Sequence, residues 1–356
     1  MAKKNINILF ITRSSEEGGE AIFIKKIKLL MKNDINIKSC SLLGYSGPEQ
    51  NDKVFLNPNF FFKKPLITIG SIQILLKEIK KVDIAEHFVF GIYSFFFFFL
   101  TQIYGKKSIV TFHTNLISKG FFRYPYSLAI KLLAVNYLIL FADKALFITD
   151  IQLQEFRRFC FLKKVFDKKS IFMHNFFESK NILKEKKFTN EFSVIFAGRY
   201  TTVKGFEDLI KVADELRYVD FYLIGDNNYI SNLPNVKNLG KMDNSVILNI
   251  FDKNSVLILP SYSETFGLVI LEAMARGLVV LASDLATIRE YFIDGRNGYL
   301  FTPGDIKKIV ELIVFLKNNP REVERISNNN LCDILNFTAE IQLPKYINLY
   351  NHILIF

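Results

Sequence analysis

Two glutamates separated by seven residues stand where a predicted strand meets a predicted helix. Residues 256–259 are apolar and read as the end of a buried strand, and residues 267–277 contain few helix breakers. Glu264 lies in the loop between them, and Glu272 lies about one and a half turns into the helix. Because the first turn of a helix presents unpaired N–H groups and a positive dipole end, this junction suits a phosphate. A ligand bound by its phosphate would bring hydroxyl groups near one or both carboxylates, although two solvated glutamates fit this stretch equally well.

A pair of cations flanks a second junction of the same kind. Residues 193–197 are predicted as a strand and residues 206–216 as a helix, and Arg199 and Lys204 lie in the loop between them. A guanidinium and an ammonium group beside a helix N-terminus can neutralise a diphosphate. Taken alone, the loop fits two solvated surface cations better.

Together the two junctions resemble the retaining glycosyltransferases of family 4. That family has an E-x7-E signature, which here runs from Glu264 to Glu272 after Pro260-Ser261 and encloses Phe266-Gly267-Leu268. The stretch from Gly198-Arg199 to Lys204-Gly205 is similar to the family's Gly-Arg…Lys-Gly element. The resemblance is strong over residues 191–301 and weak over residues 1–190.

The resemblance implies a role for each of these residues. Arg199 and Lys204 would hold the diphosphate of a nucleotide sugar, Glu272 would bind its ribose, and Glu264 would contact the donor sugar as a catalytic residue. Backbone contacts to the donor would come from Phe266, Gly267 and Leu268. The departing phosphate helps to deprotonate the acceptor in this family, so we assign no protein nucleophile.

The amino-terminal half shows the same strand and helix alternation. Residues 6–11 are predicted as a parallel strand, followed by a loop that ends in Gly18-Gly19. Residues 108–112 form another predicted strand, which ends at His113, and open α/β sheets bind ligands at the carboxyl ends of strands. In the resembled family these positions lie beside the donor. The resemblance therefore implies that Gly19 binds the nucleotide sugar and that His113 takes part in catalysis.

Length and composition favour two domains. At 356 residues, half of them hydrophobic, the chain suits two α/β domains. The resemblance implies a GT-B fold, in which two Rossmann-like parallel-sheet domains face each other across a cleft. We predict an acceptor domain over residues 1–177, a linker over 178–190 and a donor domain over 191–337. The last helix, about 338–356, would cross back to the first domain.

The cysteines and the apolar runs indicate in which cellular compartment the protein works. Cys40, Cys160 and Cys332 have no metal or disulfide spacing, which fits a reducing cytoplasm. Residues 6–11 are too short for a signal peptide, and residues 88–100 fall short of the ~20 that a membrane span needs. We predict that the Phe-rich residues 88–100 form a buried helix, with insertion into a membrane surface as the alternative.

Positive charge is concentrated in the first half. Residues 1–187 contain 30 Lys and Arg against 15 Asp and Glu, whereas the rest contain 16 against 20. The chain has no motif of interleaved aromatic and basic residues that would indicate nucleic-acid binding. An anionic membrane or a phosphate-linked acceptor is therefore the better candidate partner, and a generically basic surface without a specific partner is the alternative. We predict that the first domain docks on the anionic inner leaflet through a basic cluster: Arg157, Arg158, Lys163, Lys164, Lys168 and Lys169.

These patterns lead to one main hypothesis and two rivals. We expect a cytoplasmic, retaining hexosyltransferase that moves a sugar from a UDP- or GDP-sugar to a lipid-linked or surface-polysaccharide acceptor. It would need no cofactor and no metal, because the chain lacks the Asp-x-Asp motif of metal-bridged glycosyltransferases. A glycoside hydrolase also uses two carboxylates but needs no diphosphate clamp. A catalytically silent partner subunit with the same fold, which binds a nucleotide sugar or glycan without transfer, is the alternative.

Overall fold

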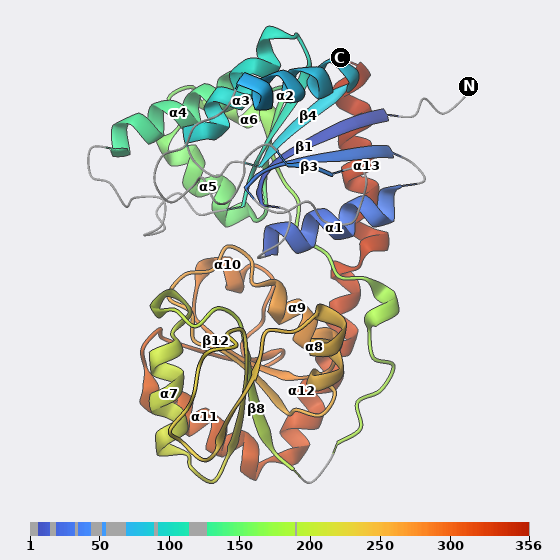
Figure 1. The fold of residues 1–356 in the computed structure, drawn as a ribbon. Helices are drawn as coiled ribbons and strands as arrows, with labels where there is room; N and C mark the ends of the chain where they lie inside the picture. The colour runs from blue at the N-terminus through green and yellow to red at the C-terminus, as the bar shows by residue number, and fades with distance from the viewer. Residues whose placement is uncertain are drawn as a thin grey trace. The chain divides into compact units, whose positions relative to one another are not determined.

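The structure is a computed structural model that describes residues 6–14, 19–32, 35–43, 52–54, 69–88, 92–113, 127–188 and 191–355. It divides into two compact units (Figure 1). The first unit comprises Met1–His174 and Leu343–Phe356, and the second comprises Asn175–Gln342. The described part of the predicted linker, residues 178–188, is therefore counted with the second unit.

The first unit is built on a parallel sheet in the order β3-β2-β1-β4-β5-β6-β7. Its strands are β1 (Ile6–Ser14), β2 (Ile35–Leu43), β3 (Asp52–Val54), β4 (Ile84–Phe88), β5 (Lys107–Phe112), β6 (Lys144–Phe147) and β7 (Ser170–Phe172). Its helices are α1 (Gly19–Met31), α2 (Ile69–Lys81), α3 (Ile92–Ile103), α4 (Ser127–Phe141), α5 (Asp150–Phe159) and α6 (Lys163–Lys169). Both faces of the sheet are covered by helices, which explains the nearly continuous apolar strands.

Successive residues of β1 serve opposite faces of this sheet, because side chains alternate along a strand. Leu9 and Ile11 pack with α2 and α3, whereas Phe10 contacts Phe88 on the side of α1. The C-terminal helix α13 (Ala339–Ile355) lies on that same side, where Tyr346 contacts Phe23 of α1. This side of the sheet is thus covered by helices from both ends of the chain, α1 and α13 (Figure 1).

A buried carboxyl group fixes α13 on the sheet. Tyr350 Oη donates a hydrogen bond of 2.7 Å to Glu86 on β4, and Thr111 Oγ1 on β5 donates one of 2.6 Å to the same carboxylate. Burial raises the pKa of Glu86 to about 7, while the two hydroxyl groups act in the opposite direction. The predicted return of the last helix to the first domain is confirmed.

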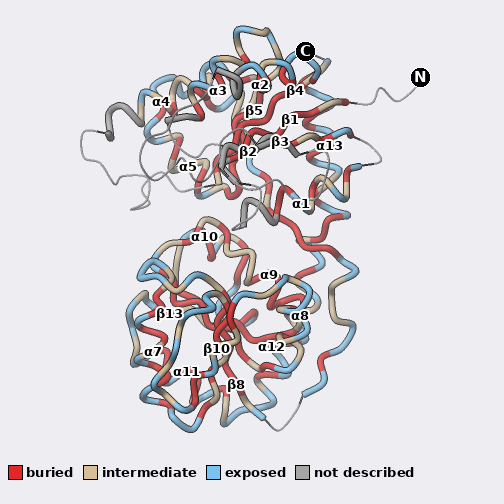
Figure 2. The backbone as a smooth tube through the Cα atoms, in the orientation of Figure 1, coloured by how far each residue is buried: buried red, intermediate tan, exposed pale blue. Residues whose placement is uncertain are grey.

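The second unit is built on a parallel sheet in the order β10-β9-β8-β11-β12-β13. Its strands are β8 (Ser193–Ala197), β9 (Asp220–Ile224), β10 (Val236–Gly240), β11 (Val256–Leu259), β12 (Val279–Ser283) and β13 (Gly298–Phe301). Its helices are α7 (Phe206–Glu215), α8 (Asn244–Phe251), α9 (Leu268–Ala275), α10 (Ala286–Arg289), α11 (Ile306–Asn318) and α12 (Pro320–Asp333). The strands at its centre are buried (Figure 2).

In each sheet the strand order reverses beside the first strand. β1 lies between β2 and β4, and β8 lies between β9 and β11. Helices therefore leave toward opposite faces at these points, and a crevice opens at the carboxyl ends of the adjacent strands. In the second unit the two loops concerned are those that follow β8 and β11. These are the loops in which the sequence places the cations and Glu264.

The predicted helix in the Phe-rich stretch is only partly buried. Phe88 ends β4, and α3 begins at Ile92. Phe97 and Phe98 are buried, but Phe96 and Phe99 are exposed. Five consecutive aromatic residues span more than one turn of a helix, so some of them must face outward. No helix in the described part of the chain is long and apolar enough to span a bilayer.

The segment His174-Asn175-Phe176-Phe177, where the first unit ends and the second begins, follows a defined path. Phe176 and Phe177 are both buried. The Phe177 backbone donates to the Phe337 carbonyl at 2.8 Å and accepts from the Ala339 amide at 2.9 Å. The segment is thus paired with the chain just before α13.

Candidate functional site

The loops after β8 and β11 meet through an ion pair. Lys204 Nζ contacts Glu264 Oε1, although the two residues are 60 positions apart in the sequence. The Lys204 side chain is 20% exposed and that of Glu264 is 9% exposed, so the pair is accessible on one side only. Adjacent strands at a reversal of strand order explain this convergence. The structure therefore joins two sequence-predicted site residues directly.

Gly205 permits this close approach. It adopts a left-handed conformation with φ of 65° between the short 3-10 helix Thr202–Lys204 and α7. A Cβ atom at this position would lie 1.9 Å from the carbonyl oxygen of Pro260. Only glycine tolerates both the backbone angle and the contact. The Lys204-Gly205 pair is thus a structural unit, in which the glycine seats the lysine beside the β11 loop.

Two hydroxyl groups hold the Glu264 loop. Ser261 Oγ donates to Glu264 Oε1 at 3.1 Å, and Thr287 Oγ1 donates to the Glu264 carbonyl oxygen at 2.8 Å. Thr287 lies in α10. The threonine therefore anchors the loop from the connection that follows the next strand, β12.

The N-terminus of α9 begins beside this loop. Gly267 precedes the helix in a left-handed conformation with φ of 75°, and no side chain caps the helix. Tyr291 Oη donates to the Phe266 carbonyl, and the two rings stack with centroids 4.7 Å apart. The turn is thus fixed by an aromatic pair. The Ile270 amide donates to the Gly267 carbonyl at 2.8 Å, whereas amides at the start of an α-helix without such a partner need an acceptor from outside the helix. This arrangement suits an anionic group.

Glu272 lies on α9 and is 6% exposed. Its Oε1 accepts a hydrogen bond of 2.6 Å from Nδ2 of Asn244, the first residue of α8. Contacts between α8 and α9 set the distance between these side chains. The Asn244 amide holds the carboxylate in place, and an ionised carboxylate offers about four lone-pair sites.

Arg199 has a different environment from Lys204. It is exposed at the carboxyl end of β8, and it makes no ion pair within the residues that the structure describes. Beside it, Tyr200 stacks on Phe206 with centroids 4.3 Å apart and donates to Asn238 Oδ1 at 2.8 Å. The backbone around Arg199 is thus anchored, while the guanidinium group is available to a ligand.

Gly19 and His113 are the two site residues that the sequence predicts in the first unit. Gly19 is the first residue of α1, and residues 15–18 of its loop lie outside the described residues. His113 follows β5, and its ring packs between Phe23 and Phe88 with centroid distances of 5.5 and 5.3 Å. Burial lowers the pKa of His113 to about 3, so the imidazole is neutral near pH 7. Its Nε2 has no hydrogen-bond partner among the described residues.

Sequence reasoning missed Asn244 and undervalued Thr287 and Ser261. Asn244 carries a weak signal, because it follows Asp243 at the start of a helix after a Gly-Lys turn. Nothing in the sequence links it to Glu272, which is 28 residues away. No cluster of three or more His, Cys, Asp or Glu able to hold a metal ion occurs among the described residues.

Removal of the Thr287 hydroxyl tests whether it positions the loop. In Thr287→Val the buried carbonyl of Glu264 loses its donor at a cost of about 1 kcal/mol. We expect turnover to fall several-fold with the fold intact, as measured by initial rates and circular dichroism. Thr287→Ser keeps the hydroxyl and serves as the matched control. Wild-type rates in both variants would show that this bond does not position Glu264.

Part of the chain is similar to known glycosyltransferases. A family model described as Glycosyl transferases group 1 matches residues 177–331. An uncharacterized 41.2 kDa protein in the cps region of Klebsiella pneumoniae is 32% identical over 44% of this chain and 46% of its own length. The capsular polysaccharide biosynthesis glycosyltransferase CapM of Staphylococcus aureus is 26% identical over 48% of this chain and 50% of its own length. The matched part thus spans about half the length of these curated relatives.

Similarity to solved structures extends further along the chain. Anabaena HepE, solved in complex with UDP and glucose, superposes with a TM-score of 0.78 over 97% of this chain and 99% of its own. Sequence identity is 18%, so this likeness concerns the fold alone. The predicted fold class is confirmed, and the chain has the two-unit α/β fold of GT-B glycosyltransferases.

Proposed function

We propose that the chain is a retaining, metal-independent glycosyltransferase of family 4 that uses a nucleotide-diphosphate sugar. The meeting of Lys204 and Glu264 beside the N-terminus of α9 carries this proposal. It joins a cation, a carboxylate and helix amides within the segment that the group 1 family model matches. The cation and the helix amides would bind a diphosphate, and the carboxylate would bind a sugar.

The donor would bind by exchange at an existing ion pair. Lys204 is held by Glu264 in the structure, so an incoming diphosphate would compete with the carboxylate for the ammonium group. Arg199, which is exposed, would contact the diphosphate without breaking an ion pair of its own. Release of Glu264 would leave an acceptor for hydroxyl groups of the donor sugar. Binding of the donor would thus place Lys204 on the diphosphate and free Glu264 for the sugar.

Catalysis would depend on stabilisation of the leaving group. Negative charge develops on the diphosphate as the glycosidic bond breaks, and fixed cations with helix amides stabilise it most at that moment. The same phosphate would take the proton of the acceptor hydroxyl, and no protein nucleophile is needed. His113 would act as a neutral hydrogen-bonding group beside the donor sugar, since its lowered pKa excludes a permanent positive charge near pH 7.

Donor and acceptor follow from the relatives at the level of class. HepE was solved with UDP, which favours a UDP-sugar over a GDP-sugar as donor. CapM acts in capsular polysaccharide biosynthesis, and the Klebsiella protein comes from a cps region. We therefore propose a surface-polysaccharide or lipid-linked precursor as acceptor, used by a cytoplasmic enzyme.

Thermal stabilisation by nucleotides tests the donor site. A ligand that binds only the folded state at 100 times its Kd raises the free energy of unfolding by ~2.7 kcal/mol. We expect UDP to raise the midpoint of unfolding more than GDP or ADP. Hydrolysis or transfer of the corresponding UDP-sugar then distinguishes an enzyme from a silent partner subunit. Absence of stabilisation by any of the three nucleotides would contradict the proposed donor site.

A further inference from the structure

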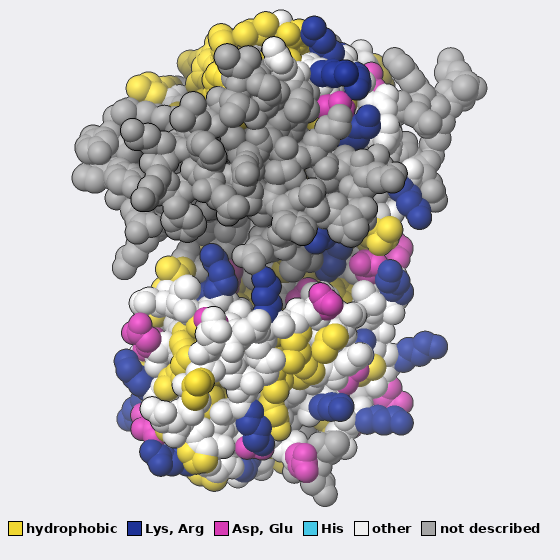
Figure 3. All heavy atoms as spheres, viewed as in Figure 1, with side chains coloured by type: hydrophobic (Ala, Val, Ile, Leu, Met, Phe, Trp, Pro, Cys, Tyr) yellow, Lys and Arg dark blue, Asp and Glu magenta, His cyan; other side chains and the backbone are white. Residues whose placement is uncertain are grey.

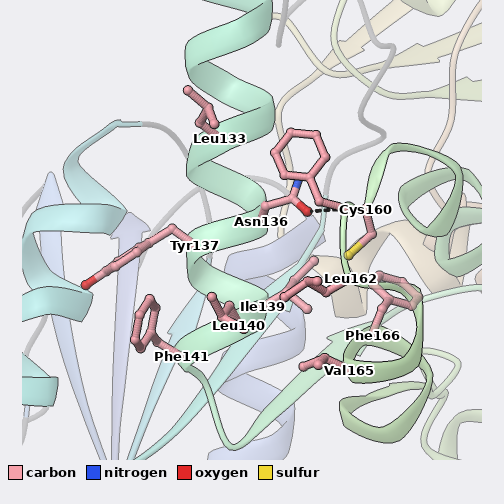
Figure 4. A pocket seen from close by; sticks show the side chains of 11 residues that line it. Leu133, Asn136, Tyr137, Ile139, Leu140, Phe141, Cys160, Leu162, Val165 and Phe166 are labelled. Carbon is pink, nitrogen blue, oxygen red and sulfur yellow. Dashed lines mark hydrogen bonds between the residues drawn. The ribbon is translucent and has the colours of Figure 1, made fainter.

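An apolar groove lies on the first unit, and none of the residues assigned to the donor lines it. It has a volume of about 230 Å³ and is bordered by α4 on one side and by the segment joining α5 to α6 on the other. Figure 4 shows Leu133, Tyr137 and Phe141 of α4, Leu162 of the joining segment and Val165 of α6 lining this space. The lining is almost wholly hydrocarbon, so the groove suits an apolar occupant.

Asn136 fixes the mouth of the groove. Its Oδ1 accepts from the Phe161 amide at 2.7 Å (Figure 4), and its Nδ2 donates to the Phe159 carbonyl at 3.1 Å. The loop is therefore pinned to α4 and presents its side chains outward. Phe161 is 65% exposed, Leu162 is 52% exposed and Leu133 on the facing helix is 60% exposed. Large apolar side chains clustered in this way mark an interaction surface.

The basic cluster predicted from the sequence lies on α5 and α6, on either side of the segment that lines the groove, but two of its six members have other partners. Arg157 forms a two-bond ion pair with Asp167, at 2.6 and 2.8 Å. Lys169 donates to the carbonyls of Leu140 and Ala142 at 2.6 and 2.7 Å, which caps the end of α4. These contacts stabilise the surface, and they occupy the charged groups of Arg157 and Lys169.

The remaining four cations are exposed and form no ion pair within the described part of the chain: Arg158, Lys163, Lys164 and Lys168. Lys163 and Lys164 directly follow Phe161 and Leu162 in sequence. Between residues 127 and 172 the chain has eight Lys and Arg against four Asp and Glu. On the second unit, by contrast, charges of both signs are interspersed over the face drawn in Figure 3.

We propose that this surface docks on a bilayer containing anionic lipids, with Phe161 and Leu162 inserted below the headgroups. Lys163, Lys164, Arg158 and Lys168 would contact the headgroup phosphates, and a segment of lipid hydrocarbon would enter the groove. Aromatic and aliphatic side chains flanked by cations are the composition expected of a membrane-interface segment. A protein partner of opposite charge would satisfy the cations but would leave the hydrocarbon groove without a dedicated occupant.

This docking surface differs from the charge-only attachment expected from the sequence, and it does not depend on sugar transfer. Cations supply long-range attraction, which declines as the Debye length falls from ~10 Å at 0.1 M salt to ~3 Å at 1 M. Insertion of Phe161 and Leu162 supplies a component that salt does not screen. Binding to anionic vesicles should therefore decline with salt but retain a measurable remainder.

Co-sedimentation with phosphatidylglycerol-containing and purely phosphatidylcholine vesicles tests the proposal on the full chain. Lys163→Gln combined with Lys164→Gln should lower the partition coefficient for anionic vesicles about 30-fold, equivalent to ~1 kcal/mol for each cation. Phe161→Ser combined with Leu162→Ser should lower it at least about ten-fold and abolish the salt-resistant remainder. The matched controls are Lys307→Gln with Lys308→Gln on α11 and the 86% exposed Ile230→Ser, which should bind as wild type.

Three results would overturn the proposal. The first is equal binding of all variants, and the second is loss of binding on Phe96→Ser with Phe99→Ser in α3 but not on Phe161→Ser with Leu162→Ser. The third is a wild-type dimer that the Phe161 and Leu162 variant dissociates, without vesicle binding in either protein, which would make the groove an interface between copies. Circular dichroism and stabilisation by UDP show that each variant is folded, and UDP binding should be unchanged throughout.

Discussion

Replacement of Arg199 or Lys204 by alanine is expected to lower turnover by about 100-fold or more, as removal of a preorganised charge contact to a developing anion usually does. Both residues follow strands or turns whose backbone is anchored, so their charges are held in place before the donor arrives. Arg199 lies on the exposed side of the loop and has no partner to lose in the described structure. Arg199→Ala should therefore leave the fold and the unfolding midpoint unchanged.

Lys204→Ala needs an additional control, because it leaves the Glu264 carboxylate without its cation. Removal of one partner of a poorly exposed ion pair destabilises a protein by more than the pair itself contributes. Lys204→Ala combined with Glu264→Gln separates this stability effect from the loss of diphosphate binding. Initial rates with a UDP-sugar and the affinity for UDP are the measurements, and Arg321→Ala on α12 is the matched surface control. Wild-type rates in Arg199→Ala and Lys204→Ala would rule out the diphosphate assignment.

The centre of each sheet could be predicted from the sequence because its strands are buried. Residues 193–197 were predicted as a strand with the bounds of β8, and residues 256–259, predicted as the end of a buried strand, form β11. Apolar runs closed by glycine or proline leave little choice of boundary in such a sheet. The Phe-rich stretch was less well predicted, since hydrophobicity alone does not indicate which side of α3 faces the sheet.

The site was predictable residue by residue but not as a set of contacts. Arg199, Lys204, Glu264 and Glu272 each stand at a recognisable junction, yet the pairing of Lys204 with Glu264 depends on strand order. The same limit applies to Asn244, which reaches Glu272 only because α8 packs on α9. Contacts between distant segments are set by topology, and a local sequence pattern contains little information about it.

Charge in the first unit shows a further limit of sequence reasoning. Six clustered cations suggest six similar contacts, but Arg157 is paired with Asp167 and Lys169 caps α4. His113 likewise lies at the predicted strand end, and only its packing against Phe23 and Phe88 shows that it is neutral near pH 7. The formal charge of a residue becomes informative once its partners and its burial are known.

Replacement of each glutamate by glutamine should separate nucleotide binding from transfer. If Glu272 accepts bonds from ribose hydroxyls, Glu272→Gln loses a charge-assisted interaction of about 1.5–3 kcal/mol, and UDP affinity should fall roughly ten-fold or more. The fold should survive, because a glutamine oxygen can still accept the bond from Asn244. Titration calorimetry with UDP, which lacks the donor sugar, measures this effect without catalysis.

Glu264→Gln should instead spare nucleotide binding and lower transfer. Glu264 holds Lys204 in the structure, so its neutral replacement frees the ammonium group for the diphosphate. UDP affinity should then stay at the wild-type value or rise, while transfer from the UDP-sugar falls by about 100-fold, since the charged contact to the donor sugar is lost. Glu324→Gln, an exposed residue of α12, is the matched control and should change neither quantity. Equal losses of UDP affinity in Glu264→Gln and Glu272→Gln would contradict the assignment of the sugar to one carboxylate and the ribose to the other.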